Sequence, residues 1–192
     1  TLAMMNIGRG FARIYTKATT ILVDDPLFTF IGSGKILGGV PIQFVYMLVV
    51  IVISGLILNR TKFGRNIYAV GDNKQAASYS GINSRRVTMT VFVIMGIFAS
   101  CAGILSSART FSAQFNVGEG SEMDAISAVV LGGTSMSGGV GRLSGTIIGC
   151  IVIGVLNNGM NILGIDSSWQ YVVKGVVVLI AVFIDYIKKM KD

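Results

Sequence analysis

Asparagine side chains interrupt an apolar run in the stretch VLNNGMNILG. An amide without a hydrogen-bond partner is costly in apolar surroundings, so each of these side chains needs one. At helical spacing Asn157 and Asn161 share one face, with Asn158 beside them. Such a polar stripe can line a pathway and exchange hydrogen bonds with the hydroxyl groups of a solute. It can equally hold a helical bundle together, and the sequence leaves both roles open.

A second candidate site is the glycine-rich stretch AVVLGGTSMSGGVGRLSG, residues 128–145, between two apolar runs. Its spacing is similar to the start of a phosphate-binding loop, but Gly139 stands where that loop requires lysine, and no strand-to-helix context surrounds it. A dinucleotide-binding fingerprint also fails, because Ser144 takes the position of its third glycine. Two interpretations remain, close helix packing through small residues and a helix broken inside a membrane, and both can hold together.

Residues suited to catalysis or metal binding are lacking. The chain has no histidine and its carboxylates are scattered over loops, so neither a nucleophile with its base nor a metal site can be assembled from the sequence. Cys101 and Cys150 lie in apolar runs, and we interpret them as small buried apolar residues. We therefore predict a protein that is not an enzyme and has no catalytic residue, metal or cofactor.

The elements that must carry these residues are long and apolar. Of 192 residues, 52% are hydrophobic and 13% charged, and the mean hydropathy is +0.71, which leaves too little polar material to coat a soluble globule. No charge occurs in residues 36–59, 87–108 or 143–165. Each of these runs is long enough to cross about 30 Å of hydrocarbon.

Two further runs complete the predicted set of membrane segments. Residues 167–184 contain only one charge, Lys174, whose ammonium we expect to reach the outer surface beside Trp169. Residues 125–141 are charge-free but shorter, and the carboxylates just before them suit a helix N-terminus: Glu119, Glu122 and Asp124. We predict an all-α polytopic membrane protein with about five to six membrane-crossing segments, one of them short and glycine-broken.

The charged residues predict the orientation of these segments, because basic loops resist translocation. We place the loop 60–86 in the cytoplasm, because it contains one acidic residue, Asp72, and six basic residues: Arg60, Lys62, Arg65, Lys74, Arg85 and Arg86. The C-terminus, with three lysines in its last residues, is predicted to be cytoplasmic as well. Residues 125–141 must then cross as a short or interrupted helix. The net charge of +7 is explained by topology, so we expect no nucleic-acid partner.

The middle of the loop 60–86 is polar but orderly. The stretch KQAASYS predicts a two-turn helix, with Asp72 or Asn73 as its cap and Gly81 as its stop. Small side chains on this helix, such as Ala76 and Ala77, fit a groove on a partner, while a solvated connector is the alternative interpretation.

Three stretches carry a resemblance to a known family: GRNIYAVGDNKQAASYSGIN, SEMDAISAVVLGGTSMSGGVGRLSGTIIG and LNNGMNILGIDSSWQYVVKGVVVLIAV. Together they closely resemble the transmembrane permease subunits of ribose- and galactose-type bacterial ABC sugar importers. The resemblance runs from residue 1 to 189, nearly the whole chain. It implies one transmembrane permease domain over residues 1–192, the C-terminal part of a longer permease whose N-terminal part is missing.

The resemblance also implies partners and roles. A permease of this family lies in the bacterial cell membrane, pairs with a second permease copy and two cytoplasmic ABC ATPase subunits, and receives a simple sugar from an extracytoplasmic binding protein. ATP is then hydrolysed by another polypeptide. The ATPase-coupling segment maps onto Gly64, Arg65, Gly71, Asp72, Asn73, Ala76, Ala77, Ser80 and Gly81. A pathway-associated broken segment maps onto Gly132, Gly133, Thr134, Ser135, Gly138 and Gly139, to which the asparagine stripe adds Asn157, Asn158 and Asn161.

Two other functions fit the residues alone. An ATP-independent secondary carrier or channel for a small polar solute would account for the broken segment and the asparagine stripe. A membrane scaffold would need neither. The identity of the solute does not follow from this sequence.

Overall fold

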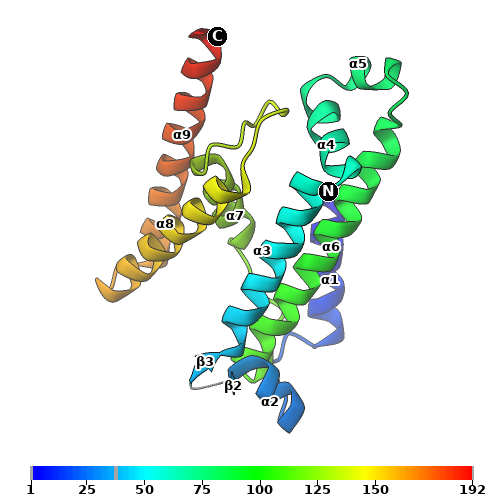
Figure 1. Cartoon of the computed structure of the whole chain (residues 1–192). Coiled ribbons are helices and arrows are strands. Elements are labelled where there is room, and N and C mark those ends of the chain that lie inside the picture. Colours follow the sequence, from blue (N-terminus) through cyan, green and yellow to red (C-terminus); the bar gives the residue numbers. More distant parts are fainter. Residues whose placement is uncertain (1, 37–38, 192) are drawn as a thin grey trace. The chain divides into compact units, whose positions relative to one another are not determined.

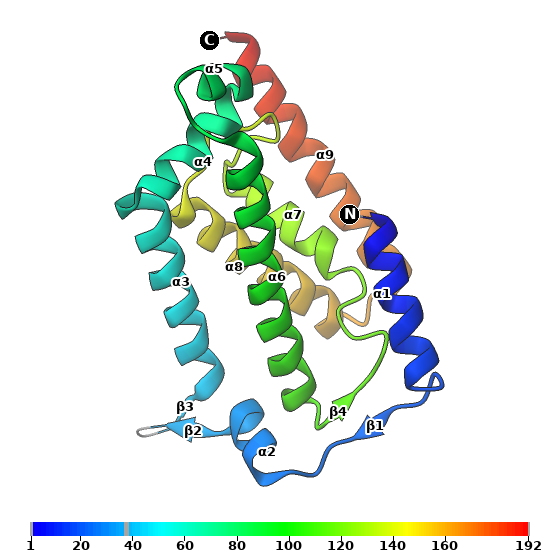
Figure 2. The same ribbon diagram turned by 90° about the vertical axis from the view of Figure 1, so that its right-hand side faces the viewer.

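Helices make up most of the chain in the computed structural model, which describes the backbone of residues 2–36 and 39–191 and the side chains of residues 3–36 and 39–183. In chain order the elements are α1 (Leu2–Tyr15), β1 (Ile21–Leu22), α2 (Pro26–Ser33), β2 (Lys35–Ile36), β3 (Val40–Pro41), α3 (Ile42–Arg60), α4 (Lys62–Asp72), α5 (Lys74–Tyr79), α6 (Ser84–Arg109), β4 (Ser112–Ala113), α7 (Ser121–Leu131), α8 (Leu143–Ile162) and α9 (Ser167–Lys191). Figure 1 shows the helices with β2 and β3, and Figure 2 shows β1 and β4 as well.

Three helices in the described residues, α3, α6 and α8, are long and apolar enough to cross a membrane, and α9 is apolar over the shorter stretch Ser167–Phe183. These helices coincide with the charge-free runs, so the all-α polytopic membrane fold is confirmed. The expectation that the cysteines are buried was wrong, since Cys101 on α6 and Cys150 on α8 are both exposed. Apolar character in a membrane helix does not require burial in protein, because lipid accepts the same side chains.

The chain forms two compact units, residues 1–53 with 89–119 and residues 54–88 with 120–192. In the first unit, β1 pairs antiparallel with β4 (Figure 2), with Ile21 opposite Ala113. Asp25 caps α2 by accepting hydrogen bonds from the backbone of Leu27 and Phe28. Gly32 of α2 meets the carbonyl group of Ala108 at the end of α6, where a β-carbon would overlap it.

In the second unit, α7, α8 and α9 pack together and form a helical group. α7 and α8 are an antiparallel hairpin joined by residues 132–142, which we call the glycine loop. A β-carbon on Gly132 would lie 2.5 Å from the carbonyl carbon of Gly145, and one on Gly149 would overlap the carbonyl oxygen of Ala128. Small residues four positions apart on each helix thus meet backbone to backbone, which confirms close packing at Gly132.

In this unit α5 and α7 end in the same way, as does α8 at Gly164. Gly81 after α5 and Gly133 after α7 have φ angles of 81° and 84°. In each case the N–H of the next residue bonds a carbonyl five positions back, Ile82 to Ala77 and Thr134 to Val129. This is the Schellman motif, in which a left-handed glycine satisfies the last carbonyls of a helix. The predicted stop at Gly81 is confirmed.

Candidate functional site

The loop predicted over residues 60–86 is folded into two helices, α4 and α5. Thr61 caps α4, accepting a hydrogen bond from Gly64 N at 3.0 Å. Asn73 caps α5 by accepting bonds from Gln75 N and Ala76 N, each at 3.0 Å. The short helix KQAASYS and its asparagine cap are therefore confirmed. α4 was not predicted, although a capping threonine before an amphipathic stretch is a recognised start signal.

The faces of α5 differ in exposure. Ala77 is buried, with 5% of its surface exposed, whereas Tyr79 is 90% exposed. Ala76 and Ser80 are exposed as well. Ala76 and Ala77 were both predicted to fit a groove on a partner, but the side chain of Ala77 packs inward. Ala76 and Ser80 remain at the surface, beside the exposed ring of Tyr79.

The end of α4 lies directly against the glycine loop. A β-carbon on Gly71 would lie 2.9 Å from the backbone nitrogen of Gly139, and one on Gly138 would overlap the carbonyl oxygen of Gly71. The hydroxyl of Tyr68 donates a hydrogen bond of 3.1 Å to the carbonyl oxygen of Gly141. We call this contact, formed by Tyr68 and Gly71 of α4 with Gly138, Gly139 and Gly141, the glycine joint.

A cavity of about 290 Å³ borders the glycine joint. Apolar residues of the second unit form much of its wall, and four hydroxyl-bearing residues also line it: Tyr68, Thr134, Ser135 and Thr146. The Thr146 hydroxyl donates to the carbonyl oxygen of Arg142 at 3.3 Å, and the Tyr68 hydroxyl to Gly141. The glycine loop therefore has a cavity on one side and close backbone contacts with α4 on the other.

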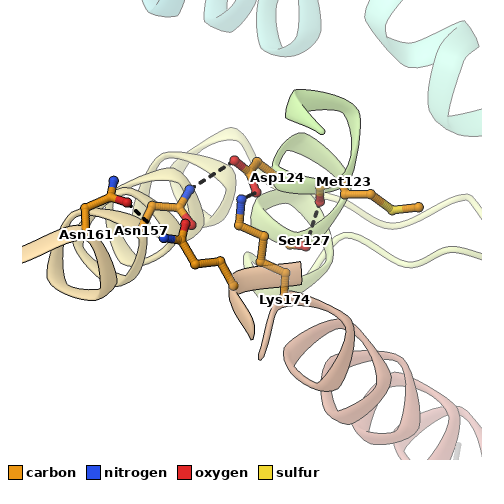
Figure 3. Close-up of polar contacts among 7 residues, drawn as sticks. Met123, Asp124, Ser127, Asn157, Asn161 and Lys174 are labelled. Atoms are coloured by element: carbon orange, nitrogen blue, oxygen red, sulfur yellow. Dashed lines mark hydrogen bonds and ion pairs between the residues drawn. The ribbon is translucent and has the colours of Figure 1, made fainter. Parts of the chain in front are cut away.

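Charged and amide side chains from three helices meet within the helical group, as Figure 3 shows. Lys174 Nζ of α9 lies 2.7 Å from Asp124 Oδ1 of α7, and Asn157 Nδ2 of α8 donates to Asp124 Oδ2 at 3.0 Å. Lys174 also lies 5.9 Å from the ring centre of Tyr171. We call Asp124, Asn157 and Lys174 the polar cluster.

The polar cluster corrects the expectation that Lys174 reaches the outer surface. Its side chain is only 13% exposed, against 28% for Asp124. A carboxylate on the neighbouring helix compensates the ammonium where it stands, so the lysine does not need to extend toward water. Glu122 and Asp124 do lie in the first turn of α7, as predicted. Asp124 nevertheless directs its carboxylate to Lys174 and Asn157 and not to the helix end.

The three asparagines have different surroundings. Asn157 joins the polar cluster, and its Oδ1 is buried without a hydrogen-bond partner among the described residues. Asn161 accepts a bond of 2.9 Å from Gln170 Nε2 of α9. Asn158 is exposed. Asn157 and Asn161 thus share a face, as predicted, and both bond neighbouring helices.

Comparison with known proteins places the chain in a family. Residues 1–182 match the family described as "Branched-chain amino acid transport system / permease component". The chain belongs to this family. This member of the permease family is 46% identical over 187 residues to the ribose import permease protein RbsC of Bacillus subtilis. The aligned region covers 96% of this chain and 58% of that protein. The predicted resemblance to ribose-type permeases is confirmed.

Other relatives of this permease-family chain carry other sugar names. It is 38% identical over 189 residues to the L-arabinose transport system permease protein AraH of Escherichia coli, covering 98% of this chain and 57% of the relative. It is 44% identical over 154 residues to the xylose transport system permease protein XylH of Haemophilus influenzae, covering 80% and 41%. The chain thus spans less than two thirds of the length of these relatives. No solved structure gives a significant match.

The structure of this permease-family chain brings together residues that the sequence assigned to two separate predicted sites. Gly71 and Asp72 belong to the predicted coupling segment, and Gly138 and Gly139 to the predicted broken segment, yet the two pairs are in contact. Asp124 and Gln170 were not expected to bond the asparagine stripe. A signal was present for Asp124, because a lysine in an apolar helix requires an acidic partner nearby.

Proposed function

We propose that the chain is the C-terminal part of a membrane-spanning permease subunit of a bacterial ABC importer, which forms a translocation path for a simple sugar. The observation that carries this proposal is the 46% identity to a ribose import permease over 96% of the chain. The subunit lies in the inner membrane as a multi-pass protein, and residues 1–192 form a single permease domain. It pairs with a second permease copy and receives sugar from an extracytoplasmic binding protein.

The same proposal makes the subunit a non-enzyme that is powered by separate cytoplasmic ATPase subunits. Residues 60–86 are its cytoplasmic coupling loop, and the C-terminus lies on the same side, in agreement with the basic residues of both. The exposed side chains of α5 support a docking role, because the large side chain of Tyr79 protrudes and the small side chain of Ala76 leaves space for a partner beside it. The docking residues are those of the coupling segment: Gly64, Arg65, Gly71, Asp72, Asn73, Ala76, Ala77, Ser80 and Gly81.

The translocation path is proposed to run along the glycine loop and the asparagine face of α8. α7 has 11 residues, or about 16 Å of helix, roughly half of the hydrocarbon thickness. Irregular backbone continues from it, which inside a membrane requires protein or water as partner. On this face the exposed amide of Asn158 is available to a hydroxyl group of a passing sugar, whereas Asn157 Oδ1 is buried.

The test is gentle detergent extraction of the native full-length protein, followed by mass-spectrometric identification of the proteins that copurify. We expect an ABC ATPase subunit to copurify. Ala76→Trp is expected to reduce its recovery at least fivefold by blocking the exposed face of α5. Ser167→Trp, at an exposed residue at the start of α9, is the matched control and should retain it. Repeated crosslinked preparations without any ATPase would remove the basis of the proposal.

An ATP-independent carrier or channel is the second candidate function. The polar cluster favours it, because ion pairs among apolar membrane helices are a common feature of ion-coupled carriers. Solute uptake into proteoliposomes distinguishes the two. Uptake that continues without ATP and follows an imposed ion gradient would indicate the carrier, and the absence of any flux would indicate a scaffold.

A further inference from the structure

The coupling segment is joined to the membrane helices in two ways. It is covalently continuous with α3 and α6, and it touches the glycine loop through the glycine joint. We propose that the glycine joint is a rigid connection through which displacement of α4 and α5 moves α7 and α8. This inference rests on the proposed function, since it assumes that an ATPase displaces the segment.

The first support is the closeness of the backbones. Gly71 meets Gly139 N where a β-carbon would lie at 2.9 Å, and a β-carbon on Gly139 would lie 2.9 Å from Asp72 Oδ1. Gly138 and Gly139 both have positive φ, at 93° and 76°, a conformation in which other residues are strained. At Gly71 and Gly138 the two backbones are in direct contact. Displacement of the end of α4 therefore acts on the loop without an intervening compressible layer.

The second support is the hydrogen bond from the Tyr68 hydroxyl to Gly141. Tyr68 lies three and four positions before Gly71 and Asp72, so all three occupy one face of α4. The glycine loop is consequently held at two points, near its middle by Gly71 and near its end by Tyr68. Two points of attachment resist rotation of the loop on α4 as well as separation from it.

The third support is the bracing of the loop itself. Ser135 N donates to Val140 O at 3.0 Å, and Gly138 N donates to Ser135 O at 3.2 Å. The loop then enters the hairpin at once, where Gly132 and Gly145 meet backbone to backbone. A displaced loop therefore acts on α7 and α8 at a point where their backbones are in direct contact. The cavity of about 290 Å³ beside the joint gives the loop space in which to move.

The experiment uses the full-length protein reconstituted with its ATPase and binding protein in proteoliposomes. Two quantities are measured, the recovery of the ATPase with the permease and the solute taken up per ATP hydrolysed. Gly71→Ala and Gly138→Ala each place a methyl group in the joint. We expect uptake per ATP to fall at least tenfold in both variants. In Gly138→Ala, which changes no residue of the coupling segment, ATPase recovery should stay within twofold of the unchanged protein.

The matched control is Gly154→Ala on α8, where an added β-carbon has no atom within 4 Å. This variant should leave ATPase recovery and uptake per ATP within twofold of the values for the unchanged protein. Tyr68→Phe preserves the ring and removes only the hydroxyl, and we expect a threefold to fivefold loss of uptake per ATP. Normal uptake per ATP in Gly71→Ala or in Tyr68→Phe would overturn the rigid joint. Failure of the unchanged protein to retain an ATPase would instead overturn the proposed function.

A covalent tether tests rigidity directly. Asp72→Cys with Gly139→Cys places two β-carbons about 3.0 Å apart, closer than the roughly 3.5–4.5 Å that a disulfide spans, so the bond forms after the loop shifts by about half an ångström. The background carries Cys101→Ala and Cys150→Ala. If α4 and the loop move as one body, oxidation leaves uptake equal to or higher than that of the reduced form of the same protein. If they slide past each other during transport, oxidation abolishes uptake, and the proposal is wrong.

Discussion

The glycine joint and the polar cluster belong to the same unit and are held together by opposite means. In the joint, glycines bring two backbones together and a side-chain hydrogen bond from Tyr68 accompanies them. In the polar cluster, the helices are linked through an ion pair and an amide, Lys174 to Asp124 and Asn157 to Asp124. The joint therefore depends on the absence of side-chain volume, and the cluster depends on balanced charge.

The difference predicts different responses to substitution. A small change of volume should perturb the backbone contacts, whereas a change of charge at constant volume should perturb the cluster. The two kinds of substitution should also differ in size. A desolvated ion left without its partner destabilises a protein more than an added methyl group does. Substitutions that change volume or charge alone therefore separate these two kinds of contact.

The largest effect is expected from breaking the ion pair of the polar cluster. Lys174→Met leaves the Asp124 carboxylate without its counter-charge in a largely desolvated position. We expect the free energy of unfolding to fall by about 3 kcal/mol, at the lower end for buried pairs because Asp124 is partly exposed. Denaturant unfolding of the full-length protein in detergent measures it.

The control for this prediction removes both charges. Asp124→Asn combined with Lys174→Met should recover the unfolding free energy to within about 1 kcal/mol of the unchanged protein. A double variant as unstable as Lys174→Met alone would show that the cluster depends on shape and not on charge. The contrast with the glycine joint would then fail.

Volume-sensitive packing is tested in the hairpin, away from the joint. Gly149→Ala places a β-carbon against the carbonyl of Ala128, and we expect a loss of about 2 kcal/mol because the helices must separate. Gly154→Ala, on the same helix but in open space, should be neutral or stabilising by up to about 1 kcal/mol. The same unfolding measurement compares the two. Equal effects would mean that the small-residue contact does not hold the hairpin.

A smaller effect is expected at the cap of α5. Asn73→Ala leaves Gln75 N and Ala76 N without an acceptor and should destabilise the helix by about 1 kcal/mol. Hydrogen exchange at these two amides should accelerate, while Asn73→Ser retains protection. Exchange within α4 should not change, since Tyr68 and Gly71 are held by the glycine loop. Faster exchange there would show that the joint depends on α5.

The smallest effect concerns Asp166, in the turn between α8 and α9. Hydrogen bonds from the Ser168 side chain and backbone lower the pKa of this carboxyl below its usual range. Because the folded-state pKa is the lower one, its contribution is present above the unfolded-state pKa and disappears as the pH falls through the folded-state pKa. Ser168→Ala should raise the pKa toward its ordinary value, as carboxyl-labelled NMR would detect. This fully exposed carboxyl should respond far less to substitution than the half-buried polar cluster.

Local pattern was sufficient for much of this fold. Uninterrupted apolar runs predicted α3, α6 and α8, since length and hydropathy decide whether a helix can span a membrane. Asn73 and Gly81 predicted the ends of α5, because helix caps depend on residues next to the helix. The start of α4 at Thr61 was available by the same reasoning but was missed.

Contacts between distant residues did not follow from pattern. Gly71 and Gly138 are far apart in the chain, and nothing in either stretch indicates that they meet. Asp124 was interpreted by its own helix end, although its actual partner, Lys174, lies two helices later. The sequence showed that the Asn157 amide needed a partner but not which residue would provide it, and it predicted an outer-surface position for Lys174 where the structure has an ion pair. The structure supplies those pairings, and the roles of the coupling and pathway residues stay predictions.

The short length of α7 has a consequence for how the protein is made. Its 11 residues are too few to enter a bilayer as an independent segment, whereas the 20 residues of α8 suffice. The small residues that join the two helices bury the backbone of α7 against its successor. We therefore expect α7 to remain outside the lipid during synthesis until α8 has left the ribosome, and the pair to insert as one helical hairpin.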